Sequence, residues 1–276
     1  MIFGNAAWGF RETALEDQLK ITHDMGLDRL ELQIAGHEND FLQLDASDAD
    51  IAKVKELFQK YGINLICAST GNDFTTADES ESMRGMENIK KVIDIAQKLE
   101  IKYLRIFAGF SPVEAVTGTR WAFMIEMLNQ VLEYGAKHNV LPSIETHGGV
   151  EEYLDGIRHF ASTSTSMVKL SKIFSELKYP FGIVFDPANL GAVGMNEDEI
   201  IALYQELSEK ISYFHLKDFA PTPQGALSPC ACGKGQLDWK KLIAGFEQFN
   251  GYGLIEYELT EDIEDGLKDS LDFLNS

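Results

Sequence analysis

The segments Ser143-Ile144-Glu145-Thr146-His147 and Ile183-Val184-Phe185-Asp186-Pro187 each end a short apolar run with a side chain that can bind a metal. The same pattern recurs in Tyr213-Phe214-His215-Leu216-Lys217-Asp218 and in Leu254-Ile255-Glu256-Tyr257-Glu258. A charge at the end of a buried apolar run is costly unless it is paired or bound to a cation. Four such charges on four successive predicted strands therefore indicate one shared site.

Outward from these segments, the whole chain alternates short β-rich runs with longer amphipathic stretches. Strands are predicted at 2–8, 29–34, 63–69, 103–108, 141–146, 181–186, 211–216 and 253–258. Helices are predicted at 13–26, 46–61, 82–99, 119–138, 165–178, 196–209, 238–249 and 261–274. This alternation predicts an α/β fold, a (β/α)8 TIM barrel that forms a single domain over residues 1–276. A doubly wound open sheet is disfavoured because the first turn, Trp8–Arg11, lacks a glycine-rich motif.

The strand pattern also predicts which side chains face the inside of the barrel. Alternate residues of a barrel strand point into the lumen or toward the helices. The predicted inward set is Glu31, Gln33, Arg105, Phe107, Glu145, His147, His215, Lys217, Glu256 and Glu258. Many of these residues lie near the carboxyl ends of the strands, where barrel enzymes build active sites. The long connections at 109–118 and 219–237 follow strands, so we expect both to act as lids on that face.

Two Glu, one Asp and one His from the last four strands can converge on one cation, and the final strand offers Glu256 and Glu258 as alternatives. Oxygen ligands with one imidazole suit Mn²⁺, Mg²⁺ or Co²⁺, and Zn²⁺ is an alternative. Four protein ligands also leave coordination positions open for a bidentate substrate. Any single charged pair would fit a scaffold salt bridge equally well. The repetition at four matching positions favours one divalent metal ion.

Composition and charge narrow the classes of partner. Lys and Arg total 24 against 44 Asp and Glu, which gives a formal net charge of −20. An acidic surface repels phosphate backbones and anionic lipids, so we expect neither nucleic acid nor a membrane as partner. No apolar run approaches the ~20 residues of a membrane span, and the first residues lack a signal-peptide pattern. We therefore expect a cytoplasmic protein with a small-molecule substrate, and homo-oligomerisation stays open.

Several motifs together resemble a known family. They are Ile144–Gly149, Phe185–Leu190, Phe214–Asp218 and Gly233–Trp239. In this combination the chain resembles the xylose-isomerase-like TIM-barrel superfamily, and in particular its sugar (phosphate) isomerase/epimerase branch. The resemblance covers the whole chain in element order and is most specific in 143–258. It implies that one divalent metal is held by the four residues at the ends of strands five to eight, namely Glu145, Asp186, His215 and Glu256.

The resemblance also implies an enzymatic function. We expect a divalent-metal-dependent isomerase or epimerase that acts on a sugar, sugar phosphate or related polyol ketone through a metal-stabilised cis-enediolate. Glu145 and Glu256 are the expected catalytic residues, one removing a proton and the other returning it. The residues expected to bind substrate are His147, Asn189, Lys217 and Arg105. Two alternatives are a dehydratase (lyase) of the inosose or dehydroshikimate dehydratase type that uses the same metal site, and a non-catalytic sugar- or metal-binding barrel.

Some positions depart from relatives in this superfamily or allow a second interpretation. The endonuclease IV branch needs additional histidines, and this chain has Cys67–Thr70, Arg105–Gly109 and Asn189 at the corresponding places, so a nuclease is disfavoured. Several epimerases carry a substrate-contacting His where this chain has Asn189, whose amide can still bind a hydroxyl. Lys217 would alternatively pair with Glu258 or Asp218. A pair between Arg105 and Glu31 across the barrel floor is also expected.

Overall fold

Eight parallel strands form one curled sheet in the computed structural model, which describes all residues 1–276. The strands are β1 (Ile2–Asn5), β2 (Leu32–Gln33), β3 (Cys67–Ser69), β4 (Tyr103–Ile106), β5 (Leu141–Glu145), β8 (Gly182–Phe185), β9 (Ile211–Leu216) and β12 (Tyr252–Ile255). Their order is β1-β12-β9-β8-β5-β4-β3-β2. Asn5 joins the β1 and β2 edges of the sheet into a closed barrel. Its backbone amide donates to Arg29 O at 3.1 Å, and its backbone carbonyl accepts from Glu31 N at 2.9 Å. The predicted (β/α)8 barrel is therefore confirmed.

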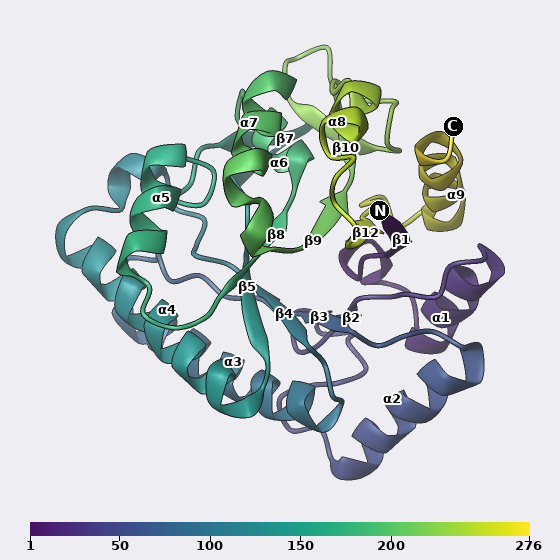
Figure 1. Cartoon of the computed structure of the whole chain (residues 1–276), viewed down its shortest axis with the longest axis horizontal. Helices are drawn as coiled ribbons and strands as arrows, with labels where there is room; N and C mark the ends of the chain where they lie inside the picture. The colour runs from purple at the N-terminus through teal and green to yellow at the C-terminus, as the bar shows by residue number, and fades with distance from the viewer.

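Helices surround this sheet, as Figure 1 shows. They are α1 (Leu15–Asp24), α2 (Asp48–Tyr61), α3 (Glu79–Lys98), α4 (Gly118–His138), α5 (Met167–Glu176), α6 (Pro187–Ala192), α7 (Glu197–Leu207), α8 (Trp239–Gly245) and α9 (Ile263–Leu274). The ends of α2 follow ordinary capping chemistry. Ser47 and Asp50 form a capping box at its start, and Gly62 ends it at a φ of 67°. None of the helices combines the length and apolar character that crossing a membrane requires.

The predicted helices are all present within a few residues of their expected bounds, and α6 is an addition. α6 begins directly after β8, where Asp186 caps the helix and Pro187 occupies its first turn. Proline fits that position because the first amide of a helix needs no partner within the helix. The chain therefore turns sharply at Asp186, and the aspartate is held at the strand end.

Inside the barrel, an apolar layer lies below the carboxyl ends of the strands. It includes Val184, Tyr213 and Leu254, all fully buried. His215 comes two residues later on β9, and Asp186 and Glu256 come two residues later, directly after β8 and β12, so they point to the same side. The acidic and imidazole side chains thus form the next layer above this apolar floor. This two-residue spacing is the physical reason for the inward direction that the strand pattern predicts.

A second sheet, not predicted from the sequence, lies beyond the carboxyl ends of the barrel strands. It is antiparallel, in the order β10-β11-β7-β6, with β6 (Gly149–Tyr153), β7 (Gly156–Phe160), β10 (Asp218–Pro221) and β11 (Leu227–Cys230). The connection at 219–237, which we expected as a long loop acting as a lid, contains most of β10 and all of β11, which pair with each other. β6 and β7 form a hairpin with Gly156 at a φ of 146°, a conformation that favours glycine.

Candidate metal centre

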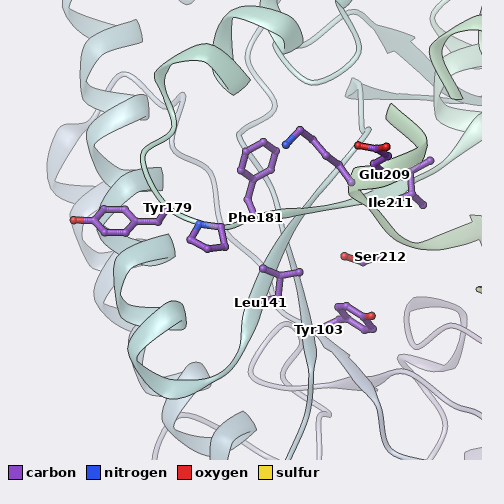
Figure 2. A pocket seen from close by; sticks show the side chains of 9 residues that line it. Tyr103, Leu141, Tyr179, Phe181, Glu209, Ile211 and Ser212 are labelled. Atoms are coloured by element: carbon purple, nitrogen blue, oxygen red, sulfur yellow. The ribbon is translucent and has the colours of Figure 1, made fainter. Parts of the chain in front are cut away.

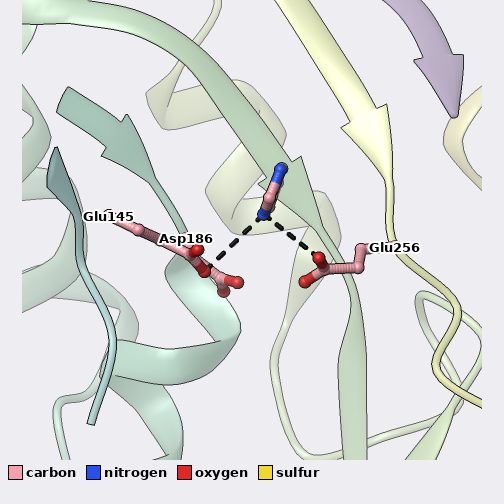
Figure 3. A group of neighbouring side chains, drawn as sticks. Glu145, Asp186 and Glu256 are labelled. Carbon is pink, nitrogen blue, oxygen red and sulfur yellow. Dashed lines mark ion pairs between the residues drawn. The ribbon is translucent and has the colours of Figure 1, made fainter. Parts of the chain in front are cut away.

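Four buried side chains meet at the carboxyl end of the barrel. One ligand atom from each of Glu145, Asp186, His215 and Glu256 lies within 4.8 Å of the others. Figure 3 shows the three carboxylates converging from separate strands. Each of these residues is at most 3 % exposed. The structure therefore brings together the four residues that the sequence pattern and the resemblance placed at one site.

Backbone contacts fix the positions of the carboxylates. Asp186 Oδ1 accepts from the amide of Asn189 at 2.9 Å, the capping bond of α6. The amide of Glu256 donates to Leu216 O at 2.9 Å, which continues the barrel ladder past the end of β12. Glu145 is the last residue of β5. These side chains are thus presented by rigid elements, which favours a precise ligand geometry.

The orientation of His215 fits a metal ligand. Its Nε2 lies 3.3 Å from Glu31 Oε1, and a carboxylate only accepts, so Nε2 carries the hydrogen. In the neutral ring Nδ1 then has a lone pair. Nδ1 is buried, has no hydrogen-bond partner, and lies 3.4 Å from Glu256 Oε1 and 3.6 Å from Glu145 Oε1. A lone pair that faces two carboxylates calls for a positive charge between them, which a bound divalent cation would supply.

Glu31 contacts His215 from behind the cluster, a contact that the sequence did not predict. It is fully buried, and besides His215 it accepts from the Tyr213 hydroxyl at 2.6 Å and from the Ala7 amide at 3.2 Å. Such a carboxylate behind a ligating histidine fixes the ring and its tautomer. The expected ion pair between Arg105 and Glu31 was wrong. Arg105 Nε instead lies 3.3 Å from Glu145 Oε2.

Without a metal, the charges of the cluster perturb one another strongly. Burial raises the pKa of Asp186 to about 7. Burial also acts to raise the pKa of Glu145, but His215 and Arg105 outweigh it and hold that pKa at about 2. Burial would lower the pKa of His215, yet Glu256, Glu31 and Glu145 together raise it well above its usual range. This concentration of negative charge, with three oxygen donors and one imidazole, fits a divalent cation.

Lys217 lies among the acidic side chains. Its Nζ is 2.7 Å from Glu256 Oε2, 2.8 Å from Glu258 Oε1 and 3.2 Å from Asp186 Oδ2. The alternative pairing with Glu258 is therefore present in the structure, whereas a pairing with Asp218 is not. The Asp218 carboxylate accepts a hydrogen bond from the backbone amide of Phe219 at 2.9 Å. It also accepts hydrogen bonds from backbone amides of the Gly233–Gly235 loop. Lys217 thus offsets part of the negative charge beside the cluster.

Asn189 and His147 complete the group expected to bind substrate. Asn189 Nδ2 donates to Glu145 Oε1 at 3.1 Å and to Asp186 Oδ2 at 3.0 Å. Its Oδ1 is buried without a partner, so it is free to accept a hydroxyl. His147 lies edge-on to the rings of Phe107 and Phe110, at 5.3 Å between centroids. A polar amide and an aromatic wall therefore border the cluster.

A cavity of about 600 Å³ opens above the cluster. Glu145 and Glu256 line it, together with all four residues expected to bind substrate, namely Arg105, His147, Asn189 and Lys217. Asp186 and His215 are fully buried and do not line it. The two glutamates thus belong both to the buried cluster and to the cavity wall. A pocket of this size is typical of a small-molecule site.

Sequence reasoning missed Gln33 and the second sheet as parts of the cavity wall. Gln33 is 8 % exposed, lines the cavity, and neither atom of its amide has a hydrogen-bond partner. Strand parity directed Gln33 inward, but no motif marked it as part of a site. Residues of β6, β7, β10 and β11 also line the cavity, and these strands were not predicted at all.

Comparisons with known proteins agree with this architecture. A family model described as xylose isomerase-like TIM barrel matches residues 19–276. No curated protein has a sequence that matches this one. Among solved structures, the probable 3-DHS dehydratase AsbF from Bacillus anthracis is 14 % identical with a TM-score of 0.79, over 100 % of this chain and 99 % of that one.

Two further structures have the same fold over nearly their whole lengths. The IolI protein with a bound zinc atom is 18 % identical with a TM-score of 0.77, over 99 % of this chain and 96 % of that one. The 3-keto-D-glucoside 4-epimerase YcjR from E. coli is 16 % identical with a TM-score of 0.72, over 100 % of this chain and 99 % of that one. At these identities the likeness shows the fold alone. Because the family model spans almost the entire barrel, the chain belongs to the xylose isomerase-like TIM barrel family.

Proposed function

We propose that this protein is a divalent-metal-dependent isomerase or epimerase of a sugar, sugar phosphate or related polyol ketone. One observation carries the proposal. Glu145 and Glu256 take part in the buried four-residue cluster and also line the cavity, whereas Asp186 and His215 lie buried behind it. Two carboxylates that reach both a metal and a substrate can move protons at a carbon whose carbonyl is polarised.

The metal would be held by Glu145, Asp186, His215 and Glu256. When bound, a divalent ion supplies positive charge that stabilises negative charge developing on the substrate oxygens. Mn²⁺, Mg²⁺ and Co²⁺ suit this oxygen-rich set best, and Zn²⁺ is the alternative, as the zinc in the IolI structure suggests. Glu31 would keep His215 in the tautomer that binds the ion.

The proton transfers fall to the two glutamates. Each has a cationic partner, since Arg105 contacts Glu145 at 3.3 Å and Lys217 contacts Glu256 at 2.7 Å. One carboxylate removes the proton from the carbon beside the carbonyl, and the other, protonated, returns a proton. Return to the opposite face of the same carbon gives an epimer. Return to the former carbonyl carbon, with the proton of the adjacent hydroxyl passing to the former carbonyl oxygen, gives an isomer. Asn189 Oδ1 would accept a substrate hydroxyl and orient the sugar.

A dehydratase that uses the same metal site is the second candidate. A lyase must also protonate a leaving hydroxyl, and the Lys217 ammonium lines the cavity between Glu256 and Glu258. AsbF, whose fold this chain shares at a TM-score of 0.79, is named as a probable dehydratase. The lysine contacts support this reading, but the paired glutamates at the cavity wall favour proton transfer without loss of water.

The test is a substrate panel in D₂O with the protein loaded in turn with Mn²⁺, Mg²⁺, Co²⁺ or Zn²⁺. The panel contains ketoses, ketose phosphates and inososes. An isomerase or epimerase incorporates deuterium and yields a rearranged product of otherwise unchanged composition, whereas a dehydratase yields a product lighter by one water molecule. Chelation with EDTA should stop either reaction. Deuterium exchange that persists in metal-free protein, or no exchange with any member, would overturn the proposal.

A further inference from the structure

The second sheet covers the cavity with only one of its faces. Val150 pairs with His159 and Glu152 pairs with Ile157, and residues directly opposite in an antiparallel pair point to the same side. Phe219 and Pro229 are opposite one another on β10 and β11. The residues that line the cavity from this sheet are Val150, Glu152, Ile157, His159, Phe219 and Pro229. We call them the roof.

Toward the turn of the hairpin, the opposite face is polar and faces outward. Glu151 pairs with Arg158, and both are exposed. The Tyr153 hydroxyl donates to Glu151 Oε2 at 3.1 Å, and the Arg158 guanidinium lies 4.1 Å from the Tyr153 ring centroid. These contacts fix which face is outside. The roof is therefore a built inner surface and not one side of a loose loop.

The roof is mainly apolar although it borders an open space. Four of its six side chains are apolar, and Val150 is 45 % exposed. Apolar surface left against water is unfavourable, and a ligand that covers it gains free energy. Phe107 and Phe110, with ring centroids 4.7 Å apart, also line the cavity. Apolar surface thus occurs both on the walls and on the roof.

The cavity is also larger than a free monosaccharide needs. Its volume of about 600 Å³ equals the volume that roughly 20 water molecules occupy in liquid water. A six-carbon sugar has only about 12 non-hydrogen atoms and bears hydroxyls on nearly every carbon. It would therefore occupy the part of the cavity next to the four-residue cluster and leave the roof uncovered.

We propose that the natural substrate is a sugar derivative with an apolar or aromatic substituent, such as a glycoside, whose substituent binds against the roof. This inference rests on the proposed function, because the reacting carbons are assigned to the space beside Glu145 and Glu256. His159 provides a polar contact on the same face: its Nδ1 is buried without a partner, and its ring lies 4.9 Å from the ring of Phe219. Burial, together with Lys217 and His147, lowers the pKa of His159 to about 4. The neutral ring can accept a hydrogen bond from a hydroxyl on the substituent or donate one to the linking oxygen.

The experiment offers keto sugars to the metal-loaded protein in three forms: free, as the methyl glycoside and as the phenyl glycoside. The readout is kcat/KM for deuterium incorporation from D₂O. We expect kcat/KM for the phenyl glycoside to exceed that for the free sugar by at least about tenfold, because burial of one apolar group gives an effect of this size. Ile157→Asp should reduce this preference to below about threefold. The matched control is Arg158→Ser on the outer face of the same strand, which should retain the full preference. Val150→Asp, at a partly exposed position, provides a second roof variant should Ile157→Asp fail to fold.

Equal kcat/KM for the free and phenyl forms, or an undiminished preference in the roof variants, would overturn the inference and leave the proposed function standing. If neither these forms nor any member of the panel exchanges deuterium, the proposed function fails, and calorimetry then decides separately whether the roof binds an apolar substituent. Unreactive phenyl glucoside should bind at least about tenfold more tightly than methyl glucoside, and Ile157→Asp should remove the difference. Equal binding of the two glucosides would overturn the roof as a binding surface.

Discussion

The two ends of the barrel both carry a hollow, yet they differ in how charge is placed. At the carboxyl end, the cavity of about 600 Å³ contains Glu145, Glu256 and Lys217, none more than 3 % exposed. At the amino end, a pocket of about 430 Å³ begins where β4, β5 and β9 start, at Tyr103, Leu141 and Ile211. Figure 2 shows that pocket with Tyr179, Phe181, Glu209 and Ser212 around it.

The contrast shows that a hollow alone does not identify a reactive site. The charged residues at the amino end, Glu209 and Lys210, are exposed, and Lys210 Nζ lies 4.6 Å from the Phe181 ring centroid. A solvated charge costs little, so its presence implies little about function. A buried charge costs several kcal/mol unless a partner compensates it, and a cluster of such charges marks a functional site. The following predictions test whether chemistry is confined to the carboxyl end.

The largest effect is expected from Glu145→Gln and Glu256→Gln. Glutamine keeps the shape of the side chain but cannot take up a proton, so kcat should fall by about 10²- to 10⁴-fold. The measurement is turnover of the substrate found in the panel, with circular dichroism to check the fold. Glu209→Gln is the matched control at the amino end and should keep full activity. Wild-type turnover in either carboxyl-end variant would refute the assignment of the two glutamates.

Loss of bound metal is expected from Asp186→Ala and His215→Ala. Both residues lie behind the cavity wall, so their removal takes away ligands without removing a proton-transfer group. Elemental analysis of the purified variants should show less than one metal ion per chain. Metal at 100 times its Kd should stabilise the wild type by about 2.7 kcal/mol, visible as a rise in Tm, and this gain should disappear in the variants. A variant that binds metal with wild-type affinity would show that its residue is not a ligand.

A smaller effect is expected from Glu31→Gln, because Glu31 is not in the four-residue cluster and contacts it through His215. Loss of its negative charge weakens the hold on the Nε2 hydrogen, and metal affinity should fall by about 10- to 100-fold. Metal titration followed by calorimetry gives the Kd directly. Tyr213→Phe removes only the hydroxyl that donates to Glu31 and should weaken metal binding less. Glu31 would have no positioning role if both variants bound metal like the wild type.

Local patterns in the sequence were sufficient for the barrel and for the layer in which the acidic cluster lies. Two-residue alternation places Asp186, His215 and Glu256 above Val184, Tyr213 and Leu254 whatever the tertiary details. Contacts between distant segments were not predictable in this way. Glu31 meets His215 across 184 positions of sequence, and no local pattern indicates that Arg105 would pair with Glu145 instead of Glu31.

The second sheet escaped prediction for a different reason. In β6, which reads Gly-Val-Glu-Glu-Tyr, adjacent charges weaken the signal of alternation. Its inner face borders a cavity and not a packed core, so Glu152 and His159 are tolerated beside Val150 and Ile157. Residues that line a cavity thus depart most from the rule that inward positions are apolar. They are therefore the hardest to recognise from sequence.

The smallest effect on activity is expected from Phe181→Ala at the amino end. The Phe181 ring is partly buried, with its centroid 5.0 Å from that of Phe174 and beneath Lys210. Its removal should cost about 2 kcal/mol, less than a fully buried phenylalanine, and lower Tm by about 4 °C. kcat/KM and metal content should stay within twofold of the wild type, because Phe181 lines the amino-end pocket and not the cavity at the carboxyl end. A large fall in kcat/KM with unchanged metal content would mean that packing at the amino end controls the reaction, and the contrast between the two ends would no longer hold.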